Sequence, residues 1–239
     1  MTNDGTLYNN GTLNTAGWLN NNGSLNNYSG GSLSNFGSLT NKSGGTLNNS
    51  GTLTNEIGGT LVNSGSIHTT SGTFTNNGTY TGSGHISGSW TDHGHIKPGH
   101  SAGVMTMDGN YYKRAGSKEI ELGGHFHGGG DNSLTEFDWL DVTGDVELAG
   151  VLDVYLIDSF ELLAGMSFDI LKVGGTLTGQ YDGLDEGRKV GSFSGTNLYI
   201  TYAGGNGNDV TLFSRAVPEP AAILLALLGL AMLPRRRRR

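Results

Sequence analysis

A glycine-led unit of six residues recurs through the first hundred residues and limits the fold more than any other feature of the chain. Examples are GTLYNN, GTLNNS and GTFTNN, and the step between glycines is mostly six residues with insertions to seven or eight. Two residues after each glycine stands one large apolar side chain, such as Leu7, Leu39 or Ile67. A short period of this kind predicts a solenoid.

One unit contains too little apolar surface to fold alone. Burying a leucine contributes about 1.5–3 kcal/mol, whereas ordering each residue costs about 1–2 kcal/mol in backbone entropy. We therefore expect the units to stack, so that each strand pairs with the strands above and below it. The leucines would form an apolar column and the inward asparagines hydrogen-bonded ladders. The prediction is an all-β fold, a parallel β-helix (β-solenoid), because no helical periodicity competes with it.

Two sizes of turn fit the glycine spacing. Pairs of six and eight residues between Gly31 and Gly59 would give a flattened coil of 14 residues, whereas units of six, six and eight give a triangular coil of 20. Strict hexads also admit left-handed winding, but the Gly-Thr-Leu order differs from the usual left-handed hexapeptide pattern. We expect a right-handed coil.

Charge is distributed unevenly along the chain. Residues 1–100 carry two basic and three acidic residues, residues 101–214 carry six and seventeen, and residues 215–239 carry six and one. Nucleic-acid binding normally requires a basic patch, so this distribution argues against nucleic acid as a partner. The chain has no cysteine, which excludes disulfides, thiolate metal sites and a cysteine nucleophile.

From about His95 the hexads give way to longer stretches with two-residue alternation, in which acidic residues fill the outward positions. The predicted strands are Val104–Met107, Lys118–Leu122, Asp138–Val142, Val146–Ile157 with a break at Gly150, Phe168–Val173, Leu198–Tyr202 and Asp209–Phe213. We expect this segment to continue the sheets of the repeat.

The order of these strands resembles a known family. The stretches are KPGHSAGVMTMDGNYYKRAGSKEIELGG, DWLDVTGDVELAGVLDVYL, FDILKVGGTLTGQYDGL and LYITYAGGNGNDVTL, which span roughly Ile96 to Phe213. They resemble the C-terminal β-helix of autotransporter passenger proteins and of surface proteins that share their repeats. His100 departs from that pattern, since it occupies a turn position more often filled by Asn or Ser.

The last 23 residues have a different composition, with an apolar run that ends in arginines. Ala221–Leu233 would span about 20 Å as a helix, against a hydrocarbon core of about 30 Å. By length this C-terminal hydrophobic helix resembles the apolar part of a signal sequence. The positive-inside bias would keep the arginines in the cytoplasm and place residues 1–216 across the membrane.

This arrangement resembles the PEP-CTERM sorting signal of Gram-negative bacteria that produce exopolysaccharide. The motif comprises Val217, Pro218, Glu219 and Pro220, then the apolar run, then Arg235, Arg236, Arg237, Arg238 and Arg239. The resemblance implies a transient stay in the inner membrane and processing near Pro-Glu-Pro by an exosortase, a membrane-embedded enzyme. The body would then be released to, or displayed at, the cell surface. A plain tail anchor is the alternative.

Such proteins begin with a signal peptide, whereas MTNDGTLYNN has neither a basic start nor an apolar run. We expect Met1 to be an internal or miscalled start, with further repeats upstream.

Two sequence features suggest metal sites. His93 with His95, and His125 with His127, would each share one strand face, but histidines between glycines are usually solvated. GGNGNDVTL from Gly204 imitates a calcium-binding nonapeptide. Calcium coils need stacked copies, and this one occurs once, so we expect a hairpin turn before the last strand.

Carbohydrate chemistry is the other candidate. Glycosidic cleavage needs carboxylates gathered at one cleft, and Asp138, Asp141 and Asp145 fit outward positions or turns better. Several aromatic residues could stack on sugars, although packing explains most of them; they are Trp18, Tyr28, Trp90, Tyr111, Tyr112 and Trp139.

Together these patterns divide the chain into a hexad-repeat solenoid (1–95), an acidic continuation (96–214) and a sorting signal (215–239). We expect a non-enzymatic surface or matrix protein, an adhesin or structural component associated with exopolysaccharide, with no catalytic residue, metal or cofactor. The alternative is a β-helix that binds or cleaves polysaccharide. That alternative gains if the acidic side chains of 131–161 converge in one groove beside Trp139, and it loses if they scatter outward.

Overall fold

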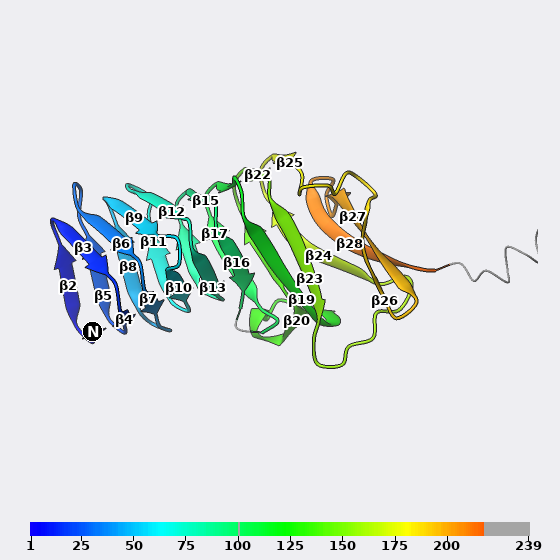
Figure 1. Ribbon diagram of the computed structural model, residues 1–239, viewed down its shortest axis with the longest axis horizontal. Coiled ribbons are helices and arrows are strands. Elements are labelled where there is room, and N and C mark those ends of the chain that lie inside the picture. Colours follow the sequence, from blue (N-terminus) through cyan, green and yellow to red (C-terminus); the bar gives the residue numbers. More distant parts are fainter. Residues whose placement is uncertain (100, 218–239) are drawn as a thin grey trace, which may run out of the picture.

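A computed structural model describes residues 1–99 and 101–217, in which the chain winds into an elongated coil with three sheet-lined faces (Figure 1). Each turn contributes one strand to each face, so every third strand of the repeat lies in the same sheet. Paired residues on successive turns are 18 and 22 residues apart in the series Leu7, Leu25 and Leu47. The triangular coil is therefore confirmed, and the flattened 14-residue coil is wrong.

Sheet A forms the first face and is parallel except at β20. Its strands are β1 (Thr2–Asn3), β4 (Trp18–Asn21), β7 (Ser38–Asn41), β10 (Thr60–Asn63), β13 (Thr79–Gly82), β16 (His95–Pro98), β19 (Ser117–His127), β20 (Thr135–Phe137) and β23 (Val151–Leu156). Both β20, antiparallel, and β23, parallel, pair with β19. A short 3-10 helix, η1 (Asn132–Leu134), precedes β20.

Sheet B forms the second face and ends in an antiparallel meander. Its parallel strands are β2 (Thr6–Asn9), β5 (Ser24–Asn27), β8 (Thr46–Asn49), β11 (Ser66–His68), β14 (His85–Ser87), β17 (Val104–Asp108), β21 (Trp139–Val142) and β24 (Ser167–Val173). The meander adds β28 (Asp209–Ala216), β27 (Thr196–Gly204) and β26 (Lys189–Phe193) in that order. The meander lies at the end of the coil far from Met1 (Figure 1).

Sheet C forms the third face. Its strands are β3 (Thr12–Thr15), β6 (Ser32–Asn35), β9 (Thr52–Asn55), β12 (Thr73–Asn76), β15 (Trp90–Asp92), β18 (Tyr111–Lys113), β22 (Val146–Leu148) and β25 (Leu177–Gly179). All three sheets pass from the hexad repeat into the acidic segment without a break, which confirms the predicted continuation.

The apolar residue of each unit points into the coil, as predicted. In sheet A, Leu19, Leu39 and Leu61 pair in register and are fully buried. Side chains of one face alternate in and out, because successive residues of a strand point to opposite sides. Each strand from β4 to β10 therefore buries one leucine and, two positions later, one asparagine.

The second buried position holds the predicted asparagine ladders. Asn21 Nδ2 donates to Asn41 Oδ1 at 2.9 Å, and Asn41 Nδ2 donates to Asn63 Oδ1 at 2.9 Å. Asn41 Nδ2 also donates to the carbonyl oxygens of Ser66 (3.0 Å) and Gly45 (3.2 Å) at the next corner. Each amide thus bonds both to the adjacent ladder residue and to backbone carbonyls of the corner, so the buried polar groups are satisfied.

From Gly23 onward, the glycines that open the units are required for close approach to the turn below rather than for a special bend. A Cβ at Gly37 would lie 2.0 Å from the carbonyl oxygen of Gly17, one turn below. Left-handed backbone occurs instead at the extra glycine of the eight-residue units, with φ of 83° at Gly30, 78° at Gly44 and 84° at Gly58. Gly therefore serves two purposes in the repeat, and its conformational freedom is used at these extra glycines and also at Gly82 (φ 117°) and Gly88 (φ 105°).

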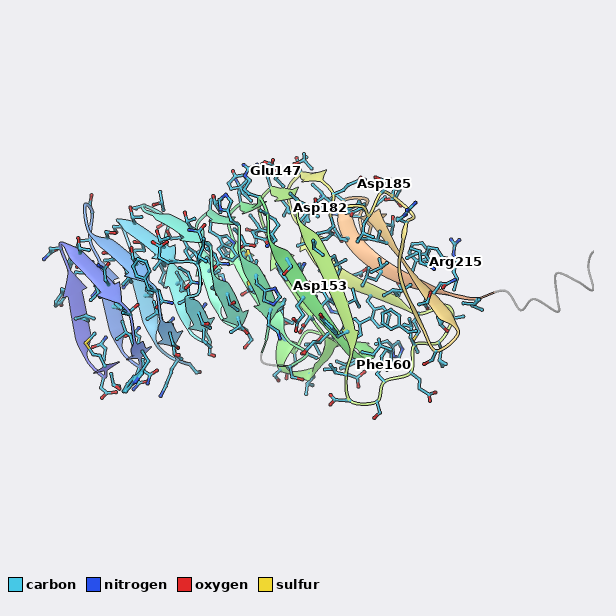
Figure 2. All side chains as sticks on the ribbon, viewed as in Figure 1. Glu147, Asp153, Phe160, Asp182, Asp185 and Arg215 are labelled. Carbon is cyan, nitrogen blue, oxygen red and sulfur yellow. The ribbon has the colours of Figure 1, made fainter. Side chains whose placement is uncertain are left out.

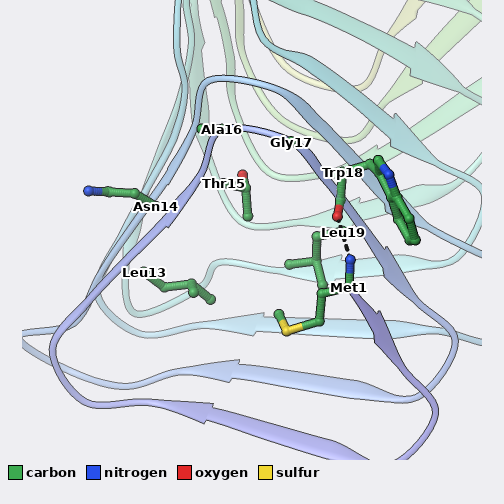
Figure 3. A pocket seen from close by; sticks show the side chains of 8 residues that line it. All are labelled: Met1, Leu13, Asn14, Thr15, Ala16, Gly17, Trp18 and Leu19. Carbon is green, nitrogen blue, oxygen red and sulfur yellow. Dashed lines mark hydrogen bonds between the residues drawn. The ribbon is translucent and has the colours of Figure 1, made fainter.

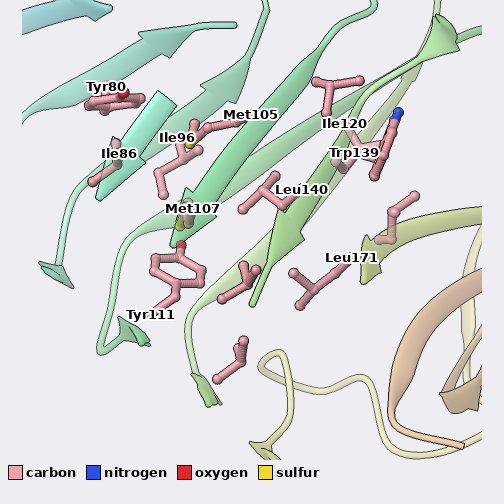
Figure 4. Packing of buried hydrophobic residues seen from close by; sticks show 14 of the residues in the cluster. Tyr80, Ile86, Ile96, Met105, Met107, Tyr111, Ile120, Trp139, Leu140 and Leu171 are labelled. Atoms are coloured by element: carbon pink, nitrogen blue, oxygen red, sulfur yellow. The ribbon is translucent and has the colours of Figure 1, made fainter. Parts of the chain in front are cut away.

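Towards the acidic segment the interior becomes wider and more apolar. Rings of Phe74, Trp90 and Tyr111 stack along the sheet C column with centroids 4.8 and 5.4 Å apart. Beyond them Leu140 and Leu171, paired on β21 and β24, face the same interior (Figure 4). The predicted alternation is confirmed in β19 and β27 but is wrong for β24 and β28, which bury consecutive residues. The predicted break at Gly150 separates β22 from β23.

Asp138 contradicts the prediction that it lies outward or forms a turn. Its side chain is buried, and its two carboxylate oxygens accept the N–H groups of Gly103 (2.8 Å) and Glu121 (2.9 Å). This carboxylate therefore joins two backbone segments inside the coil. Asp145 behaves as predicted, because its carboxylate accepts the N–H of Thr176 at the corner that precedes β25.

Candidate functional site

Val217, the first residue of the predicted sorting motif, is the last residue that the structure describes. Val217 follows β28 directly, is exposed, and donates its N–H to the carbonyl of Gly195 at 3.1 Å. The strand that it follows, β28, lies at the end of the coil far from the N-terminus (Figure 1). The rest of the predicted motif lies outside the described residues, as does the predicted hydrophobic helix; these are Pro218, Glu219, Pro220, Ala221–Leu233 and Arg235–Arg239. Within residues 1–99 and 101–217, no helix is long and apolar enough to cross a bilayer.

The structure places the two histidine pairs differently. His93 lies in the turn after β15, whereas His95 opens β16, so the prediction that they share a strand face is wrong. His95 contacts Ser117 Oγ through Nδ1 at 2.5 Å and Glu119 through Nε2 at 3.4 Å. His125 and His127 do share β19, and the His127 ring packs on Trp139 with centroids 4.0 Å apart. Among the described residues, no three His, Asp or Glu side chains gather to hold a metal ion.

The calcium-like stretch is a hairpin turn, as predicted. Gly204 of β27 pairs with Asp209 of β28, and the residues between them form the turn. The Asp209 carboxylate faces the neighbouring strand and accepts the N–H of Val173 at 2.8 Å. Its role in the structure is to fasten the meander to β24.

The acidic side chains of 131–161 do not converge. Asp141 lies on sheet B, Glu147 on sheet C and Asp153 on sheet A, and Glu147 and Asp153 are seen apart in Figure 2. Trp139 is buried beneath Lys172, whose Nζ lies 4.5 Å from its ring centroid, and beneath His127. Carboxylates on different faces cannot flank one glycosidic bond.

The aromatic residues divide into packing and surface groups. Trp90, Tyr111 and Trp139 are buried, so they cannot stack on a sugar. Tyr8 and Tyr28 are 60% and 44% exposed, and their rings are stacked with centroids 5.9 Å apart and planes 6° from parallel. Such a pair presents a broad, partly apolar platform with hydroxyl groups at its edge.

A second exposed apolar group lies at the corner between sheets C and A. Trp18, Phe36 and Ile57 occupy this corner on three successive turns, and all three are exposed. Figure 3 shows the first turn, where Trp18 and Asn14 point outward while Leu13 and Leu19 point into the coil.

Between these groups the outer faces of the repeat carry rows of neutral hydroxyl and amide groups. On sheet C, Ser34, Thr54, Thr75 and Thr91 follow one another on successive strands. On sheet B, Asn48 Nδ2 donates to Asn26 Oδ1 at 2.7 Å. On sheet C the row of small hydroxyl side chains ends at Thr91, because the next two strands place Tyr112 and Glu147 at the same position.

Sequence reasoning missed the charged groups inside the coil. Asp92 and Lys113 form a buried ion pair, and Lys118 is buried with Ile170 O as its hydrogen-bond acceptor at 3.2 Å. Burial lowers the pKa of Lys118 to about 7 and raises that of Asp138 to about 8. The spacing contained a usable clue, since Asp92 and Lys113 both stand four residues after a glycine, where other units have a buried Asn.

Comparison with known proteins adds no assignment. The chain matches no known family and no curated protein in sequence.

Proposed function

We propose that this protein is an exported β-solenoid that acts as a spacer, adhesin or matrix component in an exopolysaccharide layer. Its C-terminal motif would direct it through the inner membrane to an exosortase-type enzyme, which leaves the body displayed at or released from the cell surface. The right-handed winding and the apolar helix of Ala221–Leu233 belong to this proposal.

The position of Val217 is the observation that carries the proposal. Val217 directly follows β28, which lies at the end of the coil far from the N-terminus, so a chain held by its C-terminal segment would project the hexad repeat away from the membrane (Figure 1). A rod attached at one end suits a spacer or an adhesin, because its far end and its long faces remain available to partners.

The surface chemistry of the repeat supports a polysaccharide-rich setting. Its hydroxyl and amide rows can exchange hydrogen bonds with sugar hydroxyls without a strong charge preference. Residues 1–100 carry few charges, so nonspecific attraction to charged polymers is weak.

Deletion of residues 217–239 tests the sorting step. The chain, placed behind an export signal peptide, is expressed in an exosortase-bearing host, and cells are fractionated into inner membrane, surface and medium. We expect the full chain to reach the surface or medium and the truncated chain to remain periplasmic. A matched variant with Arg235–Arg239 replaced by Ser tests the positive-inside stop separately. Surface arrival of the truncated chain at the full chain's level would contradict the proposal.

The alternative, a polysaccharide-binding solenoid, is favoured by one observation, the stacked and exposed pair Tyr8 and Tyr28. Aromatic faces bind the apolar faces of sugars, so Tyr8→Ala should weaken retention on the producer's exopolysaccharide. Tyr155→Ala is the matched control, because Tyr155 is also exposed but lies on sheet A. Equal retention of both variants and the parent protein would show that the tyrosine pair does not bind the polysaccharide.

A further inference from the structure

Asp92 and Lys113 form an isolated amine–carboxylate contact inside the coil. They occupy directly paired positions on β15 and β18 of sheet C, and Lys113 Nζ lies 2.5 Å from Asp92 Oδ2. Both side chains are 0% exposed. An amine and a carboxyl group held in contact away from water are the two halves of an amide bond.

We propose that Lys113 and Asp92 become joined by an intramolecular isopeptide bond, which links two successive turns of the solenoid covalently. In this step the Nζ–Cγ bond forms and the Cγ–Oδ2 bond breaks. The lysine ammonium begins with three N–H protons; the amide retains one, and the other two leave with Oδ2 as water. The ion pair therefore supplies every atom of the products, and no oxidant, cofactor or activating group is consumed.

The surroundings of Asp92 Oδ1 favour attack at Cγ. This oxygen accepts the Nδ2–H of Asn76 at 2.6 Å and the backbone N–H of Gly94 at 3.0 Å. Nucleophilic attack places negative charge on the carbonyl oxygen, and two fixed donors directed at that oxygen stabilise it. The last asparagine of the sheet C ladder thus acts as an oxyanion donor.

The surroundings of Oδ2 favour its departure. The Tyr111 hydroxyl donates to Oδ2 at 3.3 Å, on the same side of the carboxylate as Lys113 Nζ. Burial and the Asp92 charge hold the pKa of Tyr111 well above its ordinary value, so the phenol keeps its proton. Because it is protonated and donates to Oδ2, Tyr111 can relay a proton, passing its own to the leaving oxygen as it takes one from the attacking amine.

The amine is both positioned and activated. Its Nζ donates to the carbonyl oxygens of Gly94 (2.7 Å) and Ser117 (3.0 Å), which fix it beside Asp92. Burial lowers the pKa of Lys113 in spite of the neighbouring carboxylate, so the nucleophilic neutral amine is more accessible than in water. The same burial excludes the water that would hydrolyse the amide.

The chain contains its own control. Lys97 Nζ and Glu119 Oε1 are also 2.5 Å apart, but they lie on the outer face of sheet A, where Lys97 is 40% exposed. Solvent stabilises both charges there, so the ammonium and carboxylate persist. We expect no bond between Lys97 and Glu119.

Mass spectrometry and chemical cleavage of the full chain test the proposal. The intact protein should be lighter than its sequence by one water molecule. Mass alone is not decisive, because Asp-Gly sequences such as Asp108-Gly109 also lose water when they cyclise. Cyanogen bromide cleaves after Met105 and Met107, which lie between the two residues. Cleavage also follows Met1 and Met166, so fragments 2–105 and 108–166 should remain one species on a denaturing gel.

Two lysine variants complete the test. Lys113→Arg keeps the positive charge but cannot form the bond, so it should show separate fragments after cleavage, whereas Lys97→Arg should behave like the parent protein. If the parent protein itself has its full mass and separates into two fragments, the pair is an ordinary salt bridge and the proposal is wrong. That measurement decides the question even if Lys113→Arg does not fold.

Discussion

The hexad-repeat half and the acidic half of the coil solve the same packing problem in different ways. In the repeat, a four-residue strand such as β7 buries one leucine and one asparagine. In the acidic half, a seven-residue strand such as β24 buries Phe168, Ile170, Leu171 and Val173. A polar ladder therefore accompanies narrow turns, and an apolar core accompanies wide ones.

The difference shows what sets the register in each half. A leucine column alone would tolerate slippage along the strand, whereas each ladder amide must meet the amide and the corner carbonyls of the adjacent turn. In the acidic half, side chains of varied shape provide the register through packing, and the antiparallel meander ends the stack. The buried charges begin at the junction of the two halves, where the asparagine ladders stop, and continue into the acidic half.

The largest effect should come from crowding a repeat corner. Gly37→Ala would place a Cβ 2.0 Å from the Gly17 carbonyl oxygen and 2.8 Å from Ala16 backbone atoms. Because only backbone could move, we expect a loss of about 4 kcal/mol or more in the free energy of unfolding. Gly17→Ala is the matched control, since its Cβ would meet nothing within 4 Å. Equal denaturant midpoints for the two variants would show that the corners are not close-packed.

Removal of the buried amine of Lys118 should instead stabilise the acidic half. Replacing buried charges by apolar side chains commonly stabilises by about 1–4 kcal/mol, and Lys118→Met keeps the length of the side chain. The pKa of Lys118 is lowered from 10.5 to about 7, so the unfolded chain binds a proton that the folded chain lacks between these values. Stability from this group therefore rises as pH increases through that interval.

The buried carboxyl group of Asp138 makes the stability depend on pH in the opposite direction. Its pKa is raised from 3.8 to about 8, so the folded chain retains a proton that the unfolded chain has lost, and stability falls as pH rises across that range. The two groups together predict a stability minimum near pH 7 to 8. Lys118→Met should remove the rise above neutral pH in denaturation curves. A variant whose curve retains that rise would show that Lys118 does not titrate with folding.

Interruption of one ladder should cost less than a corner clash. Asn41→Ala removes the hydrogen bond that Asn41 accepts from Asn21 and the bonds that it donates to Asn63 Oδ1 and to the carbonyls of Gly45 and Ser66. Each buried hydrogen bond contributes about 0.5–1.5 kcal/mol net, so we expect a loss of about 1–3 kcal/mol in the free energy of unfolding. The matched control is Asn48→Ala on the outer face of sheet B, which should change the free energy of unfolding by less than about 0.5 kcal/mol. Similar urea midpoints for both variants would make the ladder dispensable.

Sequence reasoning found the repeat because its physical requirement is local. One apolar residue at a fixed distance from a glycine determines which face is buried, and the strand and ladder predictions follow from that alone. The number of residues in one turn of the coil could not be predicted from the sequence, because six-residue and eight-residue units can be grouped in pairs or in threes. The pairing at Leu7, Leu25 and Leu47 resolves that ambiguity.

Sequence reasoning missed the buried charges for a different reason. The period of the repeat assigns Lys113 and Asp92 to inward positions, but lysine and aspartate side chains are usually exposed in proteins. Only the coincidence of opposite charges on adjacent turns makes their burial tolerable, and that coincidence depends on the register between strands. The prediction for His93 and His95 failed similarly, because the chain turns a corner there: His93 lies in the turn after β15, and His95 opens β16.

The smallest effect should come from the ion pair between Lys97 and Glu119 on the outer face of sheet A. This pair has the same kind of amine–carboxylate contact as the interior pair, but it is not fully buried. A hydrogen bond from Lys97 to Glu119 raises the pKa of Lys97, so Glu119→Gln should return that pKa towards 10.5. Exposed pairs contribute about 0.2–1 kcal/mol, and salt screens them, so the loss of stability should stay within that range and shrink in molar salt. Titration followed by NMR on the lysine side chain, with urea unfolding at two salt concentrations, measures both quantities. A cost equal to that of Asn41→Ala, unchanged by salt, would mean that the outer face of the coil bears as much of its stability as the interior ladders do.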